Sequence, residues 1–225
     1  MNKNKKSLIG PEIEALKQDG KWQRSVPKPD AAARAGQRKR RLILDQAIRR
    51  FSKQGHAAFT LRGVACDLGI SLGNLTYHYA SKAKLMEDMV EDRMIDYLED
   101  FENLLDAPDS TSRENLEHII RYLVQDLRSE EIGFFPQIWA LAMLDDAAAK
   151  QMDLIYQMQR IVFQNLITDI RPDWAPERCV ALALHIQASI EGLTLFIGQN
   201  RRSDGPFAAP EAMLLHQVSL ALDES

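Results

Sequence analysis

Side chains that can exchange hydrogen bonds are concentrated in one short stretch, residues 71–78, with the sequence SLGNLTYH. Five of the eight carry such groups: Ser71, Asn74, Thr76, Tyr77 and His78. Leu75 and Tyr79 are spaced four residues apart, so they share one face of a helix and can pack inward. The stretch therefore predicts a helix with one apolar face and one face rich in donors and acceptors.

A second short helix and a tight turn must position this stretch. The apolar spacing of Leu61, Val64, Ala65 and Leu68 predicts the preceding helix, and Thr60 is a suitable N-cap for it. Gly69 tolerates the left-handed conformation that ends a helix, and Ser71 can cap the next one. Two helices joined by a glycine turn, with a polar outer face on the second, predict a helix-turn-helix. The second helix of this motif fits the major groove of DNA.

The sequence around this motif resembles the DNA-binding domain of the TetR family of bacterial regulators. The residues that carry the resemblance are Gly69, Ile70, Ser71, Gly73, Leu75, Tyr77, His78, Ser81 and Lys82. Thr76 stands where the family usually has an aromatic residue, and Tyr79 replaces a phenylalanine while keeping the ring. The motif covers about residues 40–86, and the remainder resembles the family in its helix layout alone.

The resemblance implies roles for ten residues. Ser71, Leu72, Gly73 and Asn74 would face base edges, and Tyr77 and His78 would contact phosphates or bases further along the helix. Thr60 and Lys82 would contact backbone phosphate. The hydroxyl of Thr76, and Arg62 one turn into the first motif helix, are further candidates. It also implies a homodimeric regulator of double-stranded DNA, a repressor rather than an activator, released from a palindromic operator by a small-molecule effector.

The charge is distributed unevenly along the 225 residues, although the net charge is only −4. Residues 1–85 contain 18 Lys and Arg against 6 Asp and Glu, and the remaining residues contain 10 against 26. This asymmetry favours contact of the N-terminal third with a polyanion. A merely solvated basic tail is the alternative interpretation of the charge alone.

The periodicity predicts an all-α fold, and the composition predicts a flexible basic arm over residues 1–33. The resemblance implies that the rest divides into an N-terminal three-helix DNA-binding bundle (34–84) and a helical ligand-binding and dimerisation domain (85–225). The proline-rich arm could add phosphate contacts or lie in a minor groove, or it could have no role. Further helices are expected over residues 81–105, from Ser112, over 136–144, 147–170 and 176–199, and from Pro210. The helix over residues 81–105 would link the two folded parts.

The helix expected over residues 176–199 is apolar on all sides, so all of its sides should be covered. It is either the central helix of its own domain or a helix between its own core and a partner subunit. On the last helix, Met213, Leu214, Val218 and Leu222 offer a second apolar surface for a four-helix dimer seam. The resemblance favours the dimer.

Aromatic and methionine side chains in the C-terminal part form the candidate ligand pocket: Phe101, Trp139, Met143, Tyr156 and Met158. Methionine and aromatic surfaces adapt to small apolar ligands. The same residue types also make ordinary hydrophobic cores. The pattern leaves both interpretations open.

Enzyme chemistry has weak support in this sequence. Residues 69–73 match the G-x-S-x-G nucleophile elbow, but a helix rather than a strand is expected before them, and no α/β alternation surrounds them. The histidines lack the paired spacing of metal ligands, and Cys66 and Cys179 form no CxxC motif. We therefore expect no enzyme activity, no cofactor and no metal. A helical enzyme or adaptor in which the motif is only packing is the alternative.

The sequence has no apolar run of the roughly 20 residues that a membrane span needs, and its N-terminal lysines precede no apolar segment. A cytoplasmic protein without a membrane partner is the resulting expectation.

Overall fold

The computed structural model describes residues 13, 15, 24–28, 34–105, 110–129, 133–198, 204–205 and 209–224. Most of the predicted basic arm lies outside the described residues, and so does most of the loop over residues 200–206.

The described chain is helical, as the sequence predicted, and contains no strand. Its helices are α2 (Ala35–Ala58), α3 (Leu61–Asp67), α4 (Leu72–His78), α5 (Lys82–Leu104), α6 (Ser112–Asp126), α7 (Phe134–Ala142), α8 (Asp146–Ile170), α9 (Pro176–Ile197) and α10 (Pro210–Asp223). The termini follow the expected signals: Thr111 caps α6 together with Glu114, and Asp145 accepts from the first amides of α8. Prolines open α9 and α10.

The contacts within the chain divide it into two compact units. The N-terminal unit comprises Gly20–Tyr97 with Gly133–Met152, and the C-terminal unit comprises Met1–Asp19, Leu98–Ile132 and Asp153–Ser225. The sequence suggested a boundary after residue 84. The contacts instead group most of α5, the whole of α7 and the start of α8 with the first three helices.

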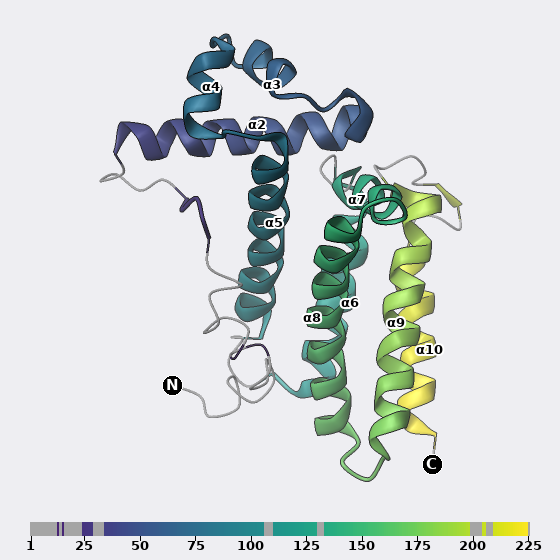
Figure 1. Ribbon diagram of the computed structural model, residues 1–225. Coiled ribbons are helices and arrows are strands. Elements are labelled where there is room, and N and C mark those ends of the chain that lie inside the picture. Colours follow the sequence, from purple (N-terminus) through teal and green to yellow (C-terminus); the bar gives the residue numbers. More distant parts are fainter. Residues whose placement is uncertain are drawn as a thin grey trace. The chain divides into compact units, whose positions relative to one another are not determined.

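In the N-terminal unit, α3 and α4 lie on one side of α2, and α5 leaves from the other side (Figure 1). The predicted inward stripe of α2 is buried: Leu44, Ala47, Ile48 and Phe51 are each no more than 4% exposed. The ring of Phe51 packs on Phe59, which follows α2, and on Phe134 of α7, at centroid distances of 5.6 and 5.2 Å. α7 thus joins the core of the helix-turn-helix bundle, which no local pattern in the sequence predicted.

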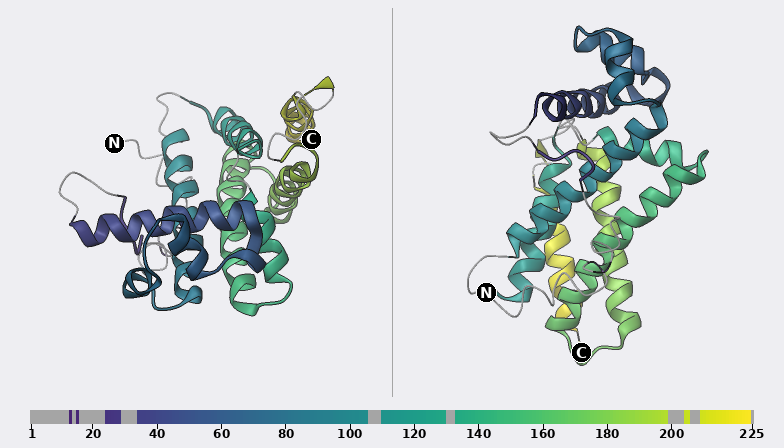
Figure 2. Two further views of the ribbon diagram at one scale, coloured as in Figure 1. Left: turned by 90° about the horizontal axis from the view of Figure 1, so that it is seen from above. Right: turned by 60° about the vertical axis from the view of Figure 1, so that its left-hand side comes forward.

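In the C-terminal unit, α6, α9 and α10 pack on one another, with the later part of α8 alongside (Figures 1 and 2). Gln187 of α9 donates to the side chain of Gln159 and the carbonyl of Tyr156, both on α8, at 3.0 and 3.1 Å. The buried amide nitrogen of Gln187 thus has two acceptors on α8 inside the unit, where an unpaired donor would be costly.

α9 is not the fully buried central helix that was one of the two alternatives. By length and composition it could cross a membrane, yet only 39% of its most apolar window is buried in the described chain. Its exposed apolar residues are Val180, Leu184, Leu195 and Phe196, and those of α10 are Met213 and Leu220.

The residues predicted to form the dimer seam on α10 need correction. Leu214, Val218 and Leu222 are each at most 4% exposed, because they pack within their own chain. Only Met213 of that set remains on the surface, at 62% exposure.

Candidate nucleic-acid interface

The N-caps predicted for α3 and α4 are both present. The hydroxyl of Thr60 accepts from the amide of Gly63 at 3.0 Å, and that of Ser71 accepts from Asn74 at 3.1 Å. Between the two helices Gly69 has a φ of 63°, the left-handed conformation that its position in the turn predicted. Each helix of the motif therefore begins with a side-chain cap, and the turn between them has the backbone conformation that glycine favours.

The two faces of α4 are as the periodicity predicted. Leu75 is fully buried and Tyr79, directly after the helix, is 1% exposed. The exposed residues are Ser71, Leu72, Gly73, Asn74 and Tyr77, the last at 86%. The ring of Tyr77 is therefore accessible to a partner on this face of α4.

Two polar side chains of α4 already have partners on the helix. The hydroxyl of Thr76 donates to the carbonyls of Leu72 and Gly73, at 3.1 and 3.2 Å. A hydroxyl has one proton, so Thr76 must give up these bonds before it can donate to a phosphate. The half-buried ring of His78 lies edge-on to that of Tyr77 at 5.2 Å.

Lys82, a predicted phosphate contact, is half-buried. Its ammonium donates to the carbonyl of His56 at 3.2 Å and lies 5.4 Å from the centre of the Phe59 ring. Burial lowers the pKa of Lys82. A contact with DNA through this side chain therefore requires it to leave the end of α2.

Much of the positive charge of the first 85 residues is neutralised within the protein. Carboxylates form ion pairs with Arg24, Lys28, Arg40, Arg41, Arg50 and Lys84. The exposed basic side chains of the N-terminal unit include Arg34, Arg38, Arg49, Lys53 and Arg62. Among the residues predicted to contact DNA, Arg62 in the first turn of α3 is the one with an exposed positive charge that suits a phosphate. Arg24 and Lys28 belong to the predicted arm, and both are paired with acids of α5.

Arg50 fixes α3 against α2, a role that the sequence analysis missed. Its guanidinium forms an ion pair with Asp67 at 2.7 Å and lies so close to Gly63 that a Cβ there would be 2.5 Å from its central carbon. The hydrogen bond from Arg50 lowers the pKa of Asp67. Glycine inside a short helix was the available signal, since it marks close approach by a neighbouring group.

A cavity of about 700 Å³ lies beside the first turn of α5 within the N-terminal unit. Its lining includes His56, Lys82, Lys84, Asp145 and the aliphatic parts of Met86, Leu141 and Ala148. Its charged groups already have partners, because Asp145 caps α8 and Lys84 pairs with Glu87 at 2.8 Å. We therefore do not assign it to the effector.

The five residues of the predicted ligand pocket differ in burial. Phe101 and Met158 are fully buried, Trp139 and Tyr156 are half-buried, and Met143 is 84% exposed. Trp139 and Met143 belong to the N-terminal unit and the other three to the C-terminal unit. Met143 is thus the member least suited to an enclosed apolar pocket.

Within the described part of the chain, no group of three or more His, Cys, Asp or Glu side chains is placed to hold a metal ion.

Residues 43–89 match the family model described as bacterial regulatory proteins of the tetR family. Similar solved structures include a transcriptional regulator from Pseudomonas aeruginosa PAO1 (15% identity, 85% of this chain and 92% of that one, TM-score 0.70) and a TetR transcriptional regulator from Legionella pneumophila (16%, 85% and 98%, 0.67). A third is a transcriptional regulator from Saccharomonospora viridis in complex with choline (18%, 84% and 97%, 0.61). A comparison with curated proteins finds no match.

Removing the space beside Gly63 should separate Arg50 from Asp67. In Gly63→Ala the new methyl group displaces the guanidinium, so the pKa of Asp67 should rise toward its ordinary value, as it should in Arg50→Ala. Because the pair lowers the folded pKa, its stabilisation is present above the unfolded pKa of Asp67 and is lost as the pH falls through the folded value. NMR titration of the Asp67 carboxyl measures the shift.

Gly36→Ala is the matched control, because no atom lies within 4 Å of a Cβ at that helical position. It should leave the pKa of Asp67 unchanged and raise stability by up to about 1 kcal/mol, the helix preference for alanine over glycine. An unshifted Asp67 in Gly63→Ala would contradict the role of the close approach.

Proposed function

We propose that this DNA-binding transcriptional regulator, whose residues 43–89 form a TetR-family domain, acts as a homodimeric repressor on a palindromic operator. The observation that carries the DNA-reading role is the exposed face of α4. Ser71, Gly73, Asn74 and Tyr77 are exposed on it, while Leu75 anchors the opposite face in the core. The same family match argues against the alternative in which the motif is only packing in an enzyme or adaptor.

Base reading is assigned to the first turn of α4. Asn74 has an amide that can pair with both N6 and N7 of adenine, and Ser71 can donate to or accept from a base edge. Leu72 is 38% exposed and offers an apolar contact for a thymine methyl group. Gly73 leaves room for the duplex to approach the helix backbone.

Phosphate contacts are assigned to exposed groups at the ends of the motif. Thr60 and Arg62 lie at the N-terminus of α3, where amides and a positive charge suit a phosphate. Tyr77 and His78 lie at the far end of α4. Lys82 and Thr76 remain candidates that must first leave their present partners.

A homodimer is the arrangement that would cover the exposed apolar face of α9 and α10. Leu184 is 53% exposed, Leu195 is 71% exposed and Met213 is 62% exposed. Burying such side chains is favourable by about 25 cal/mol per Å² of apolar surface, and two helices from each subunit can form a four-helix seam. The site of Gly192 on α9 has no atom within 4 Å of a Cβ, which leaves space for close approach.

We further propose that a small-molecule effector releases the protein from its operator. Phe101, Tyr156 and Met158 would line the effector pocket in the C-terminal unit. Trp139 and Met143 belong to the N-terminal unit, so we do not assign them to this pocket. The choline in the Saccharomonospora viridis structure belongs to that protein and supports only the general idea of an effector. We place the regulator in the cytoplasm, where its DNA lies.

The dimer and the palindrome can be tested together. A symmetric dimer places two α4 helices in major grooves on one face of the duplex, so footprinting should find two half-sites about one helical turn, or a multiple of it, apart. Leu195→Glu should give a monomer by sedimentation and lose the paired footprint, because a charge would be buried in the seam.

Leu144→Glu is the control, since Leu144 is also largely exposed, at 89% against 71% for Leu195, but lies outside α9 and α10. It should sediment and footprint as the wild type does. A single asymmetric half-site occupied by monomeric wild-type protein would contradict the proposal.

The sequence preference and the salt dependence of binding together distinguish base contacts from phosphate contacts. Asn74→Ala should relax the sequence preference at one position by about 1–3 kcal/mol if the contact to adenine is bidentate. Arg62→Ala should weaken binding to all duplexes alike and reduce the salt slope by about one, because one fewer phosphate is neutralised. Binding to selected and scrambled duplexes at several salt concentrations measures both, and equal loss of specificity in the two variants would refute these roles.

A further inference from the structure

Residues 24–28, a described stretch of the predicted arm, lie against α5 and not beside the helix-turn-helix. They are on the side of α2 opposite to α3 and α4 (Figure 1). Val26 is 3% exposed and the side chain of Arg24 is 10% exposed. A segment that buries an apolar and a charged side chain is part of the fold at these positions.

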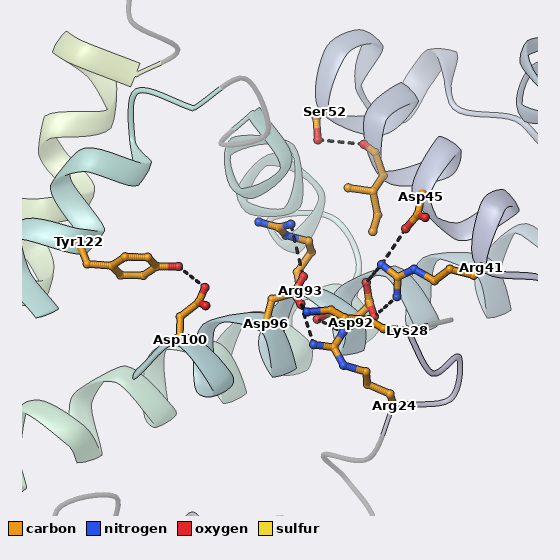
Figure 3. A network of polar contacts seen from close by, with 11 residues as sticks. Arg24, Lys28, Arg41, Asp45, Ser52, Asp92, Arg93, Asp96, Asp100 and Tyr122 are labelled. Carbon is orange, nitrogen blue, oxygen red and sulfur yellow. Dashed lines mark hydrogen bonds and ion pairs between the residues drawn. The ribbon is translucent and has the colours of Figure 1, made fainter. Parts of the chain in front are cut away.

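Arg24 binds two acids that lie one turn apart on α5 (Figure 3). One Nη donates to the carboxylate of Asp92 at 2.5 Å and to its main-chain carbonyl at 3.3 Å, and the other donates to Asp96 at 2.6 Å. Lys28 pairs with Asp96 at 2.9 Å. Although burial opposes it, the hydrogen bonds from Lys28 and Arg24 keep the pKa of Asp96 below its ordinary value.

Asp92 also holds Arg41 of α2. Its two oxygens accept from the two Nη atoms of Arg41 at 2.6 and 2.8 Å, and Arg41 pairs in addition with Asp45 at 2.7 Å. One carboxylate, 3% exposed, is therefore shared by an arginine from the N-terminal segment and an arginine from α2.

Sharing a buried carboxylate makes the two arginines dependent on each other. Planar guanidinium groups fix direction as well as charge, because each donates through a rigid fork. When one partner of a buried ion pair is removed, the remaining groups are left undercompensated and must rearrange. Loss of Arg24 therefore changes the charge balance at the carboxylate that Arg41 shares. The position of α2 against α5 changes with it.

We propose that Arg24 is a positioning residue for DNA binding, and that residues 24–28 are a strap that fixes the angle between α2 and α5. The strap acts on α4 through α2 and touches no DNA. DNA affinity then depends on Arg24, but its salt slope does not, because no phosphate is neutralised by this side chain. The inference needs only the DNA-binding role of the motif and is independent of the proposed dimer and effector.

The test compares Arg24→Met and Arg24→Lys with the wild-type chain. Methionine keeps much of the buried stem and removes the charge, whereas lysine keeps a charge that can bind one of the two acids. The probe is a duplex that the wild-type protein selects from random-sequence DNA. Arg24→Met should bind it on the order of tenfold more weakly, equivalent to about 1.4 kcal/mol. The dependence of its DNA affinity on salt should be unchanged. Arg24→Lys should recover part of the loss.

A distance measurement gives a readout that lost stability alone would not change. Spin labels on the exposed native Cys66 of α3 and on a Glu87→Cys replacement on α5, in a Cys179→Ser background, report the distance from α5 to α3, which Arg50 holds on α2. With labelled chains diluted in excess unlabelled chains, so that only distances within one chain are measured, the wild-type background should give one narrow distribution. Arg24→Met should give a broader or shifted one while the protein remains folded.

Arg113→Ala is the matched control, because it breaks an ion pair of similar length, 2.7 Å to Asp223, in the C-terminal unit. It should change neither the distance distribution nor DNA affinity. A slope reduced by about one in Arg24→Met would make Arg24 a phosphate contact and overturn the strap. Unchanged affinity together with an unchanged distribution would overturn it as well. If random-sequence selection recovers no specific duplex, the DNA-reading role fails, while the distance distribution still tests the strap.

Discussion

Two buried carboxylates on α5 determine where α2 can lie. Asp88 and Asp92 are spaced one helical turn apart, and their side chains are 0% and 3% exposed. Buried charges of this kind are tolerated only with charged or hydrogen-bonding partners, and consecutive arginines of α2 supply them. Arg40 pairs with Asp88 at 2.7 Å and Arg41 with Asp92 at 2.6 Å.

Arg40 extends this constraint to the recognition helix. Its guanidinium lies 5.1 Å from the centre of the ring of Tyr79, the residue that ends α4, in a cation–π arrangement. One arginine thus connects the end of α4, the N-terminal part of α2 and a carboxylate of α5. Buried ion pairs add little net stability, since desolvation offsets their attraction, but they penalise every arrangement in which a partner is displaced. Their contribution here is to geometry.

The helix caps and the glycine turn could be predicted from the sequence, because each depends on a few neighbouring residues. The hydroxyls of Thr60 and Ser71 cap the helices that follow them, and Gly69 adopts the positive φ that the turn requires. Non-local parts could not. In the sequence, an arginine that pairs with a buried acid cannot be told from an arginine that faces solvent. Likewise, an apolar stripe such as that of α10 does not reveal whether its own chain or a partner covers it.

Because the sequence does not show which arginines form ion pairs within the protein, the charge asymmetry has to be interpreted differently. Counting all Lys and Arg of the first 85 residues overestimates the phosphates that they can neutralise, because acids on α3 and α5 already pair with Arg40, Arg41 and Arg50. These three arginines position α2 and α3, while the exposed face of α4 bears mostly neutral groups. In the proposed function, phosphate affinity then comes from exposed side chains such as Arg62, and sequence preference from neutral ones such as Asn74. The position of those neutral groups depends on arginines that do not face the DNA.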